Sequence, residues 1–197
     1  MIQGGATIRV EHIKTHKNLH SHNIASHTNA GGDQHEVSCY QADEAGDGND
    51  NWRVECNGEL NKGEAFRLVH VSTNGALHSH TRKYPFIDQN EVTSRGPGRD
   101  DNDMFVVSEI KSGMPQARPQ WNGQAICYGM VIKIKHQKTN WHLHSHAINY
   151  PGGSRQQQVT CYGGNDDNDL WEIKGPHGER DNQRNGTRRK KKKKKNR

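Results

Sequence analysis

Apolar and polar residues alternate along this chain in short runs, and the same runs recur three times. Each copy opens on a stretch with apolar residues at every second position, namely Ile8/Val10, Phe66/Leu68 and Ile132/Ile134. A period of two places apolar side chains on one face of a half-buried β-strand. Further short strands are predicted at a Leu-His-Ser-His motif, at a Val-Ser/Thr stretch and at a stretch that starts on an aromatic residue. Four strands in each of three copies predict about twelve strands and no helix.

The copies also align at polar positions, which makes the repeat a strong signal. The Leu-His-Ser-His motif occupies residues 19–22, 77–80 and 143–146, at offsets of 58 and 66 residues. An earlier histidine and a closing aromatic recur in register with it, and an Asn-Asp pair ends two residues before each aromatic. These residues are His12, His70 and His136, and Trp52, Phe105 and Trp171.

Three repeats of this size favour one closed fold. One copy cannot bury its apolar face alone, so the copies must pack against each other. A propeller typically has about four to eight blades, whereas three units close a trefoil around a pseudo-threefold axis. We therefore predict an all-β, β-trefoil domain over residues 3–178. Its repeats cover about 5–60, 61–118 and 119–178, and a basic tail, expected to be disordered, follows at 179–197.

Composition limits the size of the core and the cellular context. Only 29% of residues are hydrophobic and 21 are glycine, which fits a small shared core with many tight turns. No segment approaches the roughly 18–20 apolar residues that span a bilayer, so we expect no membrane span. The N-terminus lacks the apolar stretch of a secretory signal. The protein is then intracellular as written, or lies in the endoplasmic-reticulum lumen or is secreted if a leader was removed.

The net charge of +6 is unevenly distributed. Residues 180–197 hold eleven Lys/Arg and one Asp, which gives +10 and leaves −4 for the rest of the chain. A nucleic-acid-binding domain normally places basic residues on its folded face, interleaved with aromatics. We therefore expect nucleic acid or another polyanion to bind only through the tail, if at all.

Four cysteines limit redox and zinc chemistry. Cys39, Cys56, Cys127 and Cys161 allow three complete disulfide pairings, and the sequence does not choose among them. No two are spaced as Cys-x-x-Cys, which excludes a zinc knuckle and a thioredoxin-type motif.

Several of these motifs resemble one known repeat. Residues 128–136, 143–146, 149–151 and 156–162, together with Trp52-Arg53-Val54-Glu55-Cys56-Asn57-Gly58, resemble the MIR repeat. That repeat is shared by protein O-mannosyltransferases, inositol trisphosphate receptors and ryanodine receptors. A chain of three such repeats is similar to stromal cell-derived factor 2 and its relatives. The resemblance covers nearly the whole chain except the tail.

The resemblance implies a β-trefoil of three MIR repeats. For the soluble relatives it implies a lumenal partner of endoplasmic-reticulum chaperones that acts on misfolded or O-mannosylated clients. In the transferases the MIR domain accompanies a multi-span catalytic part, which nothing here matches, so that activity is not carried over. The soluble relatives have a signal peptide and often an HDEL-type ending, and this chain ends instead in lysines, Asn196 and Arg197.

The histidines of the three motifs form i, i+2 pairs, and each pair lies on one face of its strand. Neutral imidazoles could bind zinc or copper. The pairs lie on different lobes and cannot converge on one ion, and each is explained as well by bonds to neighbouring backbone. We therefore predict no metal and no cofactor.

The same motifs could form one ligand pocket per lobe, since sugar binding needs planar polar groups beside an apolar platform. Candidates in the third lobe are His144, Ser145, His146, Tyr150 and Gln157, and those in the second are His78, His80, Tyr84 and Gln89. The first lobe offers His20 and His22 but has Ser26-His27 where the others have tyrosine.

Catalysis and calcium binding have little support. The motif serines (Ser21, Ser79, Ser145) sit between histidines that point to the opposite strand face, so these histidines are poorly placed to take a serine proton. We predict no enzymatic activity. The acidic-amide runs at 47–51, 99–103 and 165–169 lack EF-hand spacing and are predicted to be turns closed by side-chain-to-backbone bonds.

The sequence thus predicts a non-catalytic binding module for glycoprotein clients or chaperone partners, in protein quality control and O-mannosylation. Two alternatives remain open: a carbohydrate-binding lectin outside that pathway, and an intracellular scaffold with a polyanion-binding tail.

Overall fold

A computed structural model describes residues 1–26, 33–42, 46–85, 87–96, 98–113 and 123–177, so the predicted basic tail lies outside the described residues. The strands are β1 (Thr7–His12), β2 (Lys17–Ala25), β3 (Gln34–Ala42), β4 (Trp52–Glu55), β5 (Ala65–His70), β6 (Ala76–Lys83), β7 (Asn90–Arg95), β8 (Phe105–Ser112), β9 (Val131–His136), β10 (His142–Asn149), β11 (Gln157–Tyr162) and β12 (Leu170–Lys174). Three single 3-10 turns, Gly48–Asp50, Asp101–Asp103 and Asp167–Asp169, are the helical elements in this part of the chain. The prediction of about twelve strands is confirmed.

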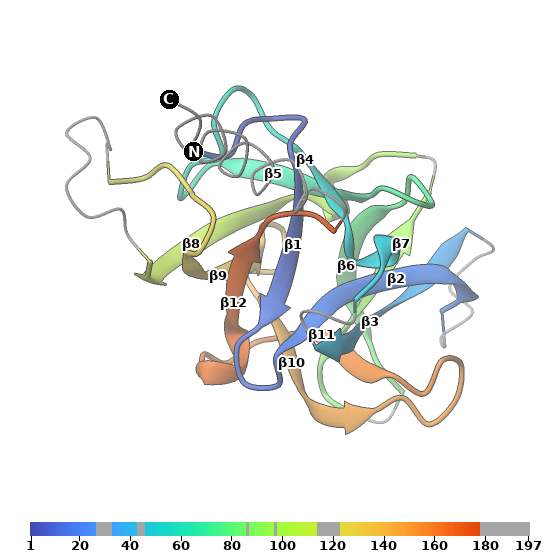
Figure 1. The fold of residues 1–197 in the computed structure, drawn as a ribbon. Helices are drawn as coiled ribbons and strands as arrows, with labels where there is room; N and C mark the ends of the chain where they lie inside the picture. The colour runs from blue at the N-terminus through green and yellow to red at the C-terminus, as the bar shows by residue number, and fades with distance from the viewer. Residues whose placement is uncertain (27–32, 43–45, 86, 97, 114–122, 178–197) are drawn as a thin grey trace, which may run out of the picture.

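Six of the strands close a barrel. β1 pairs with β4, β4 with β5, β5 with β8, β8 with β9, β9 with β12, and β12 with β1, all antiparallel. In Figure 1 the barrel strands β1, β9 and β12 run alongside one another. Closure removes the unpaired strand edges that would otherwise be exposed.

The other six strands form three hairpins that cap one end of the barrel. These hairpins, β2–β3, β6–β7 and β10–β11, meet through pairings among β3, β7 and β11. Figure 1 shows β2, β3, β10 and β11 gathered to one side of the barrel. A six-stranded barrel capped by a hairpin triplet is a β-trefoil, as predicted. We call its parts lobe 1 (β1–β4), lobe 2 (β5–β8) and lobe 3 (β9–β12).

The core consists of the period-two apolar positions and the closing aromatics. Trp52, Phe105 and Trp171 occupy equivalent positions and are completely buried. The indole Nε1 of Trp52 donates to the Leu19 carbonyl and that of Trp171 to the Leu143 carbonyl, each at 2.9 Å. These bonds satisfy the polar atom that burial of a tryptophan brings with it.

Three backbone bonds join the lobes at the axis. The amide of Ile2 donates to the carbonyl of Ile126, that of Leu60 to Ile2, and that of Ile126 to Leu60, each at 2.8 Å. All three side chains are at most 1% exposed. Ile2 takes part in this ring although it lies one residue before the boundary expected from the repeat.

Two further features bear on the sequence expectations. The four cysteines are free thiols, with Cys39 and Cys161 buried and Cys56 and Cys127 partly exposed. Throughout the described ranges, the helices are too short and too polar to cross a membrane.

Candidate functional site

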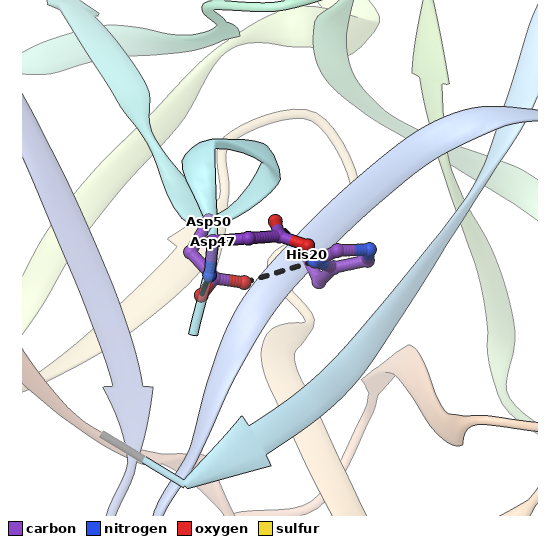
Figure 2. A group of neighbouring side chains, drawn as sticks. All are labelled: His20, Asp47 and Asp50. Atoms are coloured by element: carbon purple, nitrogen blue, oxygen red, sulfur yellow. Dashed lines mark hydrogen bonds and ion pairs between the residues drawn. The ribbon is translucent and has the colours of Figure 1, made fainter. Parts of the chain in front are cut away.

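The first histidine of each motif is buried and held by a buried carboxylate. Nδ1 of His20 lies 2.9 Å from Oδ1 of Asp50, and the matching pairs His78–Asp103 and His144–Asp169 lie at 2.8 Å. Figure 2 shows this contact in lobe 1, where His20 comes from β2 and Asp50 from the 3-10 turn before β4. The histidines are 3% exposed and the aspartates not at all. Each pair therefore ties a hairpin to the turn that enters the barrel.

The acidic-amide runs place these carboxylates. In lobe 3 the Asp166 side chain caps the 3-10 turn by accepting from the amide of Asn168 at 2.7 Å. Asp169 in return accepts from the amide of Asp166 at 2.8 Å, which completes a capping box. Lobes 1 and 2 repeat this arrangement. The prediction of turns closed by side-chain-to-backbone bonds is confirmed.

The central serine of each motif bonds across its own hairpin. Oγ of Ser21 donates to the Glu36 carbonyl at 3.0 Å, that of Ser79 to Glu91 at 2.9 Å and that of Ser145 to Gln158 at 2.6 Å. All three serines are completely buried. A hydroxyl committed to a backbone carbonyl and sealed from solvent is poorly suited to act as a nucleophile.

The earlier histidines tie neighbouring lobes together. Nε2 of His12 lies 3.1 Å from the carbonyl of Asn168, and the same bond joins His70 to Asn49 and His136 to Asn102. Each Nδ1 bonds a threonine hydroxyl three residues on, at 2.8–2.9 Å. Burial lowers the pKa of each of these histidines to about 4. They are therefore neutral at physiological pH.

The second histidine of each motif is partly exposed and stays beside the first. The ring centroids of His20 and His22 are 5.3 Å apart, those of His78 and His80 5.5 Å, and those of His144 and His146 5.2 Å. Burial lowers the pKa of His80 to about 4 and also lowers the pKa of His146. These second histidines are the motif side chains that reach the surface.

The tyrosines assigned to ligand pockets lie inside the protein. Tyr84 and Tyr150 are 3% and 4% exposed, and their rings contact each other at a centroid distance of 5.4 Å. Ser26 takes the equivalent place in lobe 1, since its amide bonds across the hairpin as those of the tyrosines do. The Tyr150 hydroxyl lies 2.8 Å from the Val37 carbonyl. Both side chains fill the centre of the hairpin triplet and do not face separate surface pockets.

The two glutamine candidates also bond protein groups. Gln89 accepts a hydrogen bond from the Thr160 hydroxyl in the next lobe. Nε2 of Gln157 donates to Oγ of Ser145 at 2.8 Å and to Oγ1 of Thr15 at 3.0 Å. These residues join lobes, and their positions do not suit contact with a surface ligand.

The structure brings together three His-Asp-Asp groups with ligand atoms within 4.8 Å of one another: His20/Asp47/Asp50, His78/Asp100/Asp103 and His144/Asp166/Asp169. Their atoms already bond each other and turn amides. In lobe 3 the Lys133 ammonium lies 3.6 Å from Asp169 Oδ2. An imidazole N–H that donates to the carboxylate accounts for the short His–Asp distances in all three groups. Each group is therefore a hydrogen-bonded joint between a hairpin and a turn.

Sequence reasoning missed the surface around these joints. In lobe 3 the Tyr162 ring lies 4.9 Å from the His144 ring, and the exposed Asp166 carboxylate is 3.9 Å from His144 Nδ1. We name Tyr162, His146 and Asp166, which surround the buried His144, the lobe 3 ring surface. Strand alternation could have indicated it, because Tyr162 follows the buried Cys161 and must face the other way.

Lobe 1 has the same surface and lobe 2 does not. Tyr40 lies 5.1 Å from the His20 ring, and with His22 and the exposed Asp47 it forms the lobe 1 ring surface. In lobe 2 the tyrosine is replaced by Arg95, which forms an ion pair with the cap residue Asp100. That pair neutralises the carboxylate that lobes 1 and 3 leave available.

Comparison with known proteins agrees with the repeat and the fold. The MIR domain family matches residues 1–85 and 76–181. A stromal cell-derived factor 2-like protein of Dictyostelium discoideum is 52% identical over 59 residues, which cover 28% of each chain. One from Arabidopsis thaliana is 41% identical over 106 residues, covering 51% of this chain and 47% of the relative. The matches thus span half or less of these curated relatives.

A solved structure is similar over most of the chain. It is the S. cerevisiae protein O-mannosyltransferase complex bound to the sugar donor, with a TM-score of 0.73 and 28% identity. The match covers 88% of this chain and 25% of that one. The chain therefore belongs to the MIR-domain family, and its three repeats close into a β-trefoil.

Proposed function

We propose that this chain is a non-catalytic binding module that holds mannosylated proteins through the lobe 1 and lobe 3 ring surfaces. The observation that carries the proposal is that both surfaces pair an exposed carboxylate with a tyrosine and the partly exposed second imidazole of the motif. A pyranose presents an apolar C–H face to a ring and hydroxyls to a carboxylate, so these groups suit it. The family's occurrence in protein O-mannosyltransferases supports mannose as the sugar.

The hydrogen bonds of the potentially reactive side chains support a non-catalytic role. The motif serines bond carbonyls, the first histidines bond buried aspartates, and the tyrosine hydroxyl of Tyr150 faces the interior. General-base catalysis needs a free proton acceptor next to a nucleophile, and the motif residues do not offer that combination.

The experiment is titration of the full chain with an O-mannosylated peptide, followed by calorimetry. We expect two sites per chain, because the Arg95–Asp100 pair occupies lobe 2. Tyr162→Ala should remove the lobe 3 site. Asp166→Asn should weaken it about tenfold while keeping the turn, because asparagine is also a good cap.

Asp167→Asn is the matched control, since it removes the same charge from the neighbouring exposed residue and should leave binding unchanged. Equal binding by wild type, Tyr162→Ala and Asp166→Asn would contradict the proposal. Binding of the unmodified peptide at the same affinity would also contradict it.

Protein partners are a second candidate, favoured by an exposed apolar pair. Ile24 in β2 and Ile148 in β10 occupy equivalent strand ends and are 37% and 51% exposed, whereas lobe 2 has Arg82 there. Exposed apolar side chains at matched positions suit contact with a chaperone or co-chaperone. Capture of a DnaJ-type co-chaperone by wild type but not by Ile24→Ser/Ile148→Ser would support this role.

We place the protein in the endoplasmic-reticulum lumen, as a working hypothesis that rests on the kinds of protein it resembles. Localisation of the tagged native gene product, with its N-terminus sequenced, tests it. A cytosolic or nuclear signal would instead favour the scaffold alternative.

A further inference from the structure

The turn that follows β4 contains an Asn-Gly pair, Asn57-Gly58, and both of its residues are exposed. Such a pair is chemically labile. The backbone nitrogen of the second residue can attack the side-chain carbonyl carbon of the asparagine, and glycine has no Cβ to hinder that attack. The chain has four Asn-Gly pairs, and two of them, at 57–58 and 74–75, lie entirely within the described residues. These two pairs have the same reacting groups in different surroundings, so their structures show which one is open to the reaction.

Both reacting groups of the first pair are unoccupied. The Asn57 side chain forms no hydrogen bond within the part of the chain that the structure describes, and neither does the backbone N–H of Gly58. Gly58 has φ 75°, and a Cβ placed on it would have nothing within 4 Å. Neither group therefore has to leave a partner, and the space around them is open for the ring that the reaction forms.

The second pair is held by its neighbours. Oδ1 of Asn74 accepts a hydrogen bond from Arg53 at 3.3 Å, and the backbone N–H of Gly75 donates to Oγ1 of Thr73 at 3.4 Å. A Cβ placed on Gly75 would lie 2.3 Å from Oγ of Ser94, so this turn is also crowded. Attack at Asn74 requires each reacting group to give up a hydrogen bond, which should slow it about tenfold in the folded protein.

We propose that Asn57 is a modification site at which asparagine converts to aspartate and isoaspartate. The backbone nitrogen of Gly58 forms a bond to Cγ of Asn57 while the Cγ–Nδ2 bond breaks. The proton of the attacking nitrogen goes to the leaving nitrogen, so ammonia departs and a succinimide ring remains. Water then opens the ring. Opening at Cγ gives aspartate, and opening at the main-chain carbonyl gives isoaspartate, whose backbone runs through the side-chain carbon.

The modified turn holds the N-terminal segment, residues 1–5, against the barrel. The Gly58 carbonyl accepts a hydrogen bond from the amide of Gly4 at 2.7 Å. A Cβ placed on Gly4 would lie 2.5 Å from the Cys56 carbonyl oxygen, so the two backbones are in close contact. Ile2 of the same segment belongs to the backbone ring at the axis. Isoaspartate adds one atom to the main chain between Cys56 and Gly58, and this displacement should loosen the N-terminal segment.

The test is incubation of the full chain at neutral pH, followed by peptide mass spectrometry. Methyl transfer from S-adenosylmethionine by an isoaspartate-specific methyltransferase measures the isoaspartate that forms. We expect the peptide with Asn57 to deamidate about tenfold faster than the peptide with Asn74. In urea the two pairs lose their different surroundings, so their rates should converge. Equal rates in the folded protein, or no isoaspartate at position 57, would overturn the proposal.

Asn57→Gln should abolish the isoaspartate signal of this turn, because attack on the longer side chain has to close a larger ring, which forms far more slowly. Asn74→Gln is the matched control and should leave that signal unchanged. Freshly purified Asn57→Asp carries the new carboxylate without the added main-chain atom. The isoaspartate form should therefore unfold at a lower urea concentration than Asn57→Asp, and equal midpoints would contradict the loosening of the N-terminal segment. The ring surfaces take no part in the reaction, so its outcome is independent of the proposed function.

Discussion

Nδ1 of His78 lies 2.8 Å from Oδ1 of Asp103, and both side chains are almost completely buried. The histidine belongs to the hairpin strand β6 and the aspartate to the turn that leads into the barrel strand β8. One bond therefore fixes a hairpin to the barrel within lobe 2. The same bond recurs in the other two lobes.

Removal of one partner should strongly destabilise the fold, because the other is left buried and unsatisfied. We expect Asp103→Ala to lower the free energy of unfolding by about 3–5 kcal/mol, measured by urea denaturation. Asp101, an exposed residue in the same turn, provides the control. Asp101→Asn should change the free energy of unfolding by less than about 0.5 kcal/mol. If Asp103→Ala unfolds at the same urea concentration as the wild type, the bond between His78 and Asp103 does not stabilise the fold.

Stability should fall as the pH is lowered from about 6.5 to about 4. The folded protein keeps His12, His70 and His136 neutral with pKa values of about 4, whereas the unfolded chain titrates near the ordinary value of 6.5. In that window the unfolded state binds more protons than the folded state. Each histidine therefore lowers the free energy of unfolding by about 1.4 kcal/mol for every pH unit of acidification. Above pH 6.5 the effect is absent. Urea midpoints measured across this range check it. His70→Gln should reduce the slope by about a quarter at most, because the lowered pKa values of His80 and His146 also contribute to it.

The thiols should react in two classes. Burial raises the pKa of Cys39 and of Cys161 to about 12, so these two form almost no thiolate at pH 8. We expect iodoacetamide to label Cys56 and Cys127 in the folded protein, and all four cysteines in urea. Peptide mass spectrometry identifies which cysteines carry the label. Rapid native labelling of Cys39 or Cys161 would show that the hairpin triplet opens.

The contact of Lys83 with Trp141 should contribute to the junction of lobes 2 and 3. Lys83→Gln is expected to cost about 0.5–1 kcal/mol, the size of a partly exposed cation–π contact. Lys83 also pairs with the exposed Asp88 at 3.1 Å, so Asp88→Asn serves as the comparison. If the two variants lose equal stability, the ion pair accounts for the effect and the ring does not.

The local pattern of this chain was sufficient to predict the fold. Period-two apolar residues such as Ile8 and Val10 define strands, and three aligned copies define the closure, because a single copy has no partner for its apolar face. The turns were predictable for the same reason. An aspartate that caps a turn bonds amides two and three residues away, and such short-range bonds can be read from spacing.

The site depended on contacts between residues far apart in the chain. Tyr84 and Tyr150 were predicted to face ligands, and the structure instead packs them together on the axis. Hairpins from different lobes meet there, and no spacing within one repeat reveals that contact. Tyr162 was not predicted as a site residue, and its contact with the His144 ring became visible only in the folded structure.

What the sequence alone determined is the repeated unit, its strands, its turns and the family to which it belongs. Tertiary structure decided which histidines are buried joints and which reach the surface, since Leu-His-Ser-His reads the same for both. It also decided that Trp141 packs between the Gly163 backbone and the Lys83 ammonium at the junction of lobes 2 and 3. Burial and inter-lobe contact arise only when the three copies close around their axis, and these properties determine which polar groups remain free to bind a ligand.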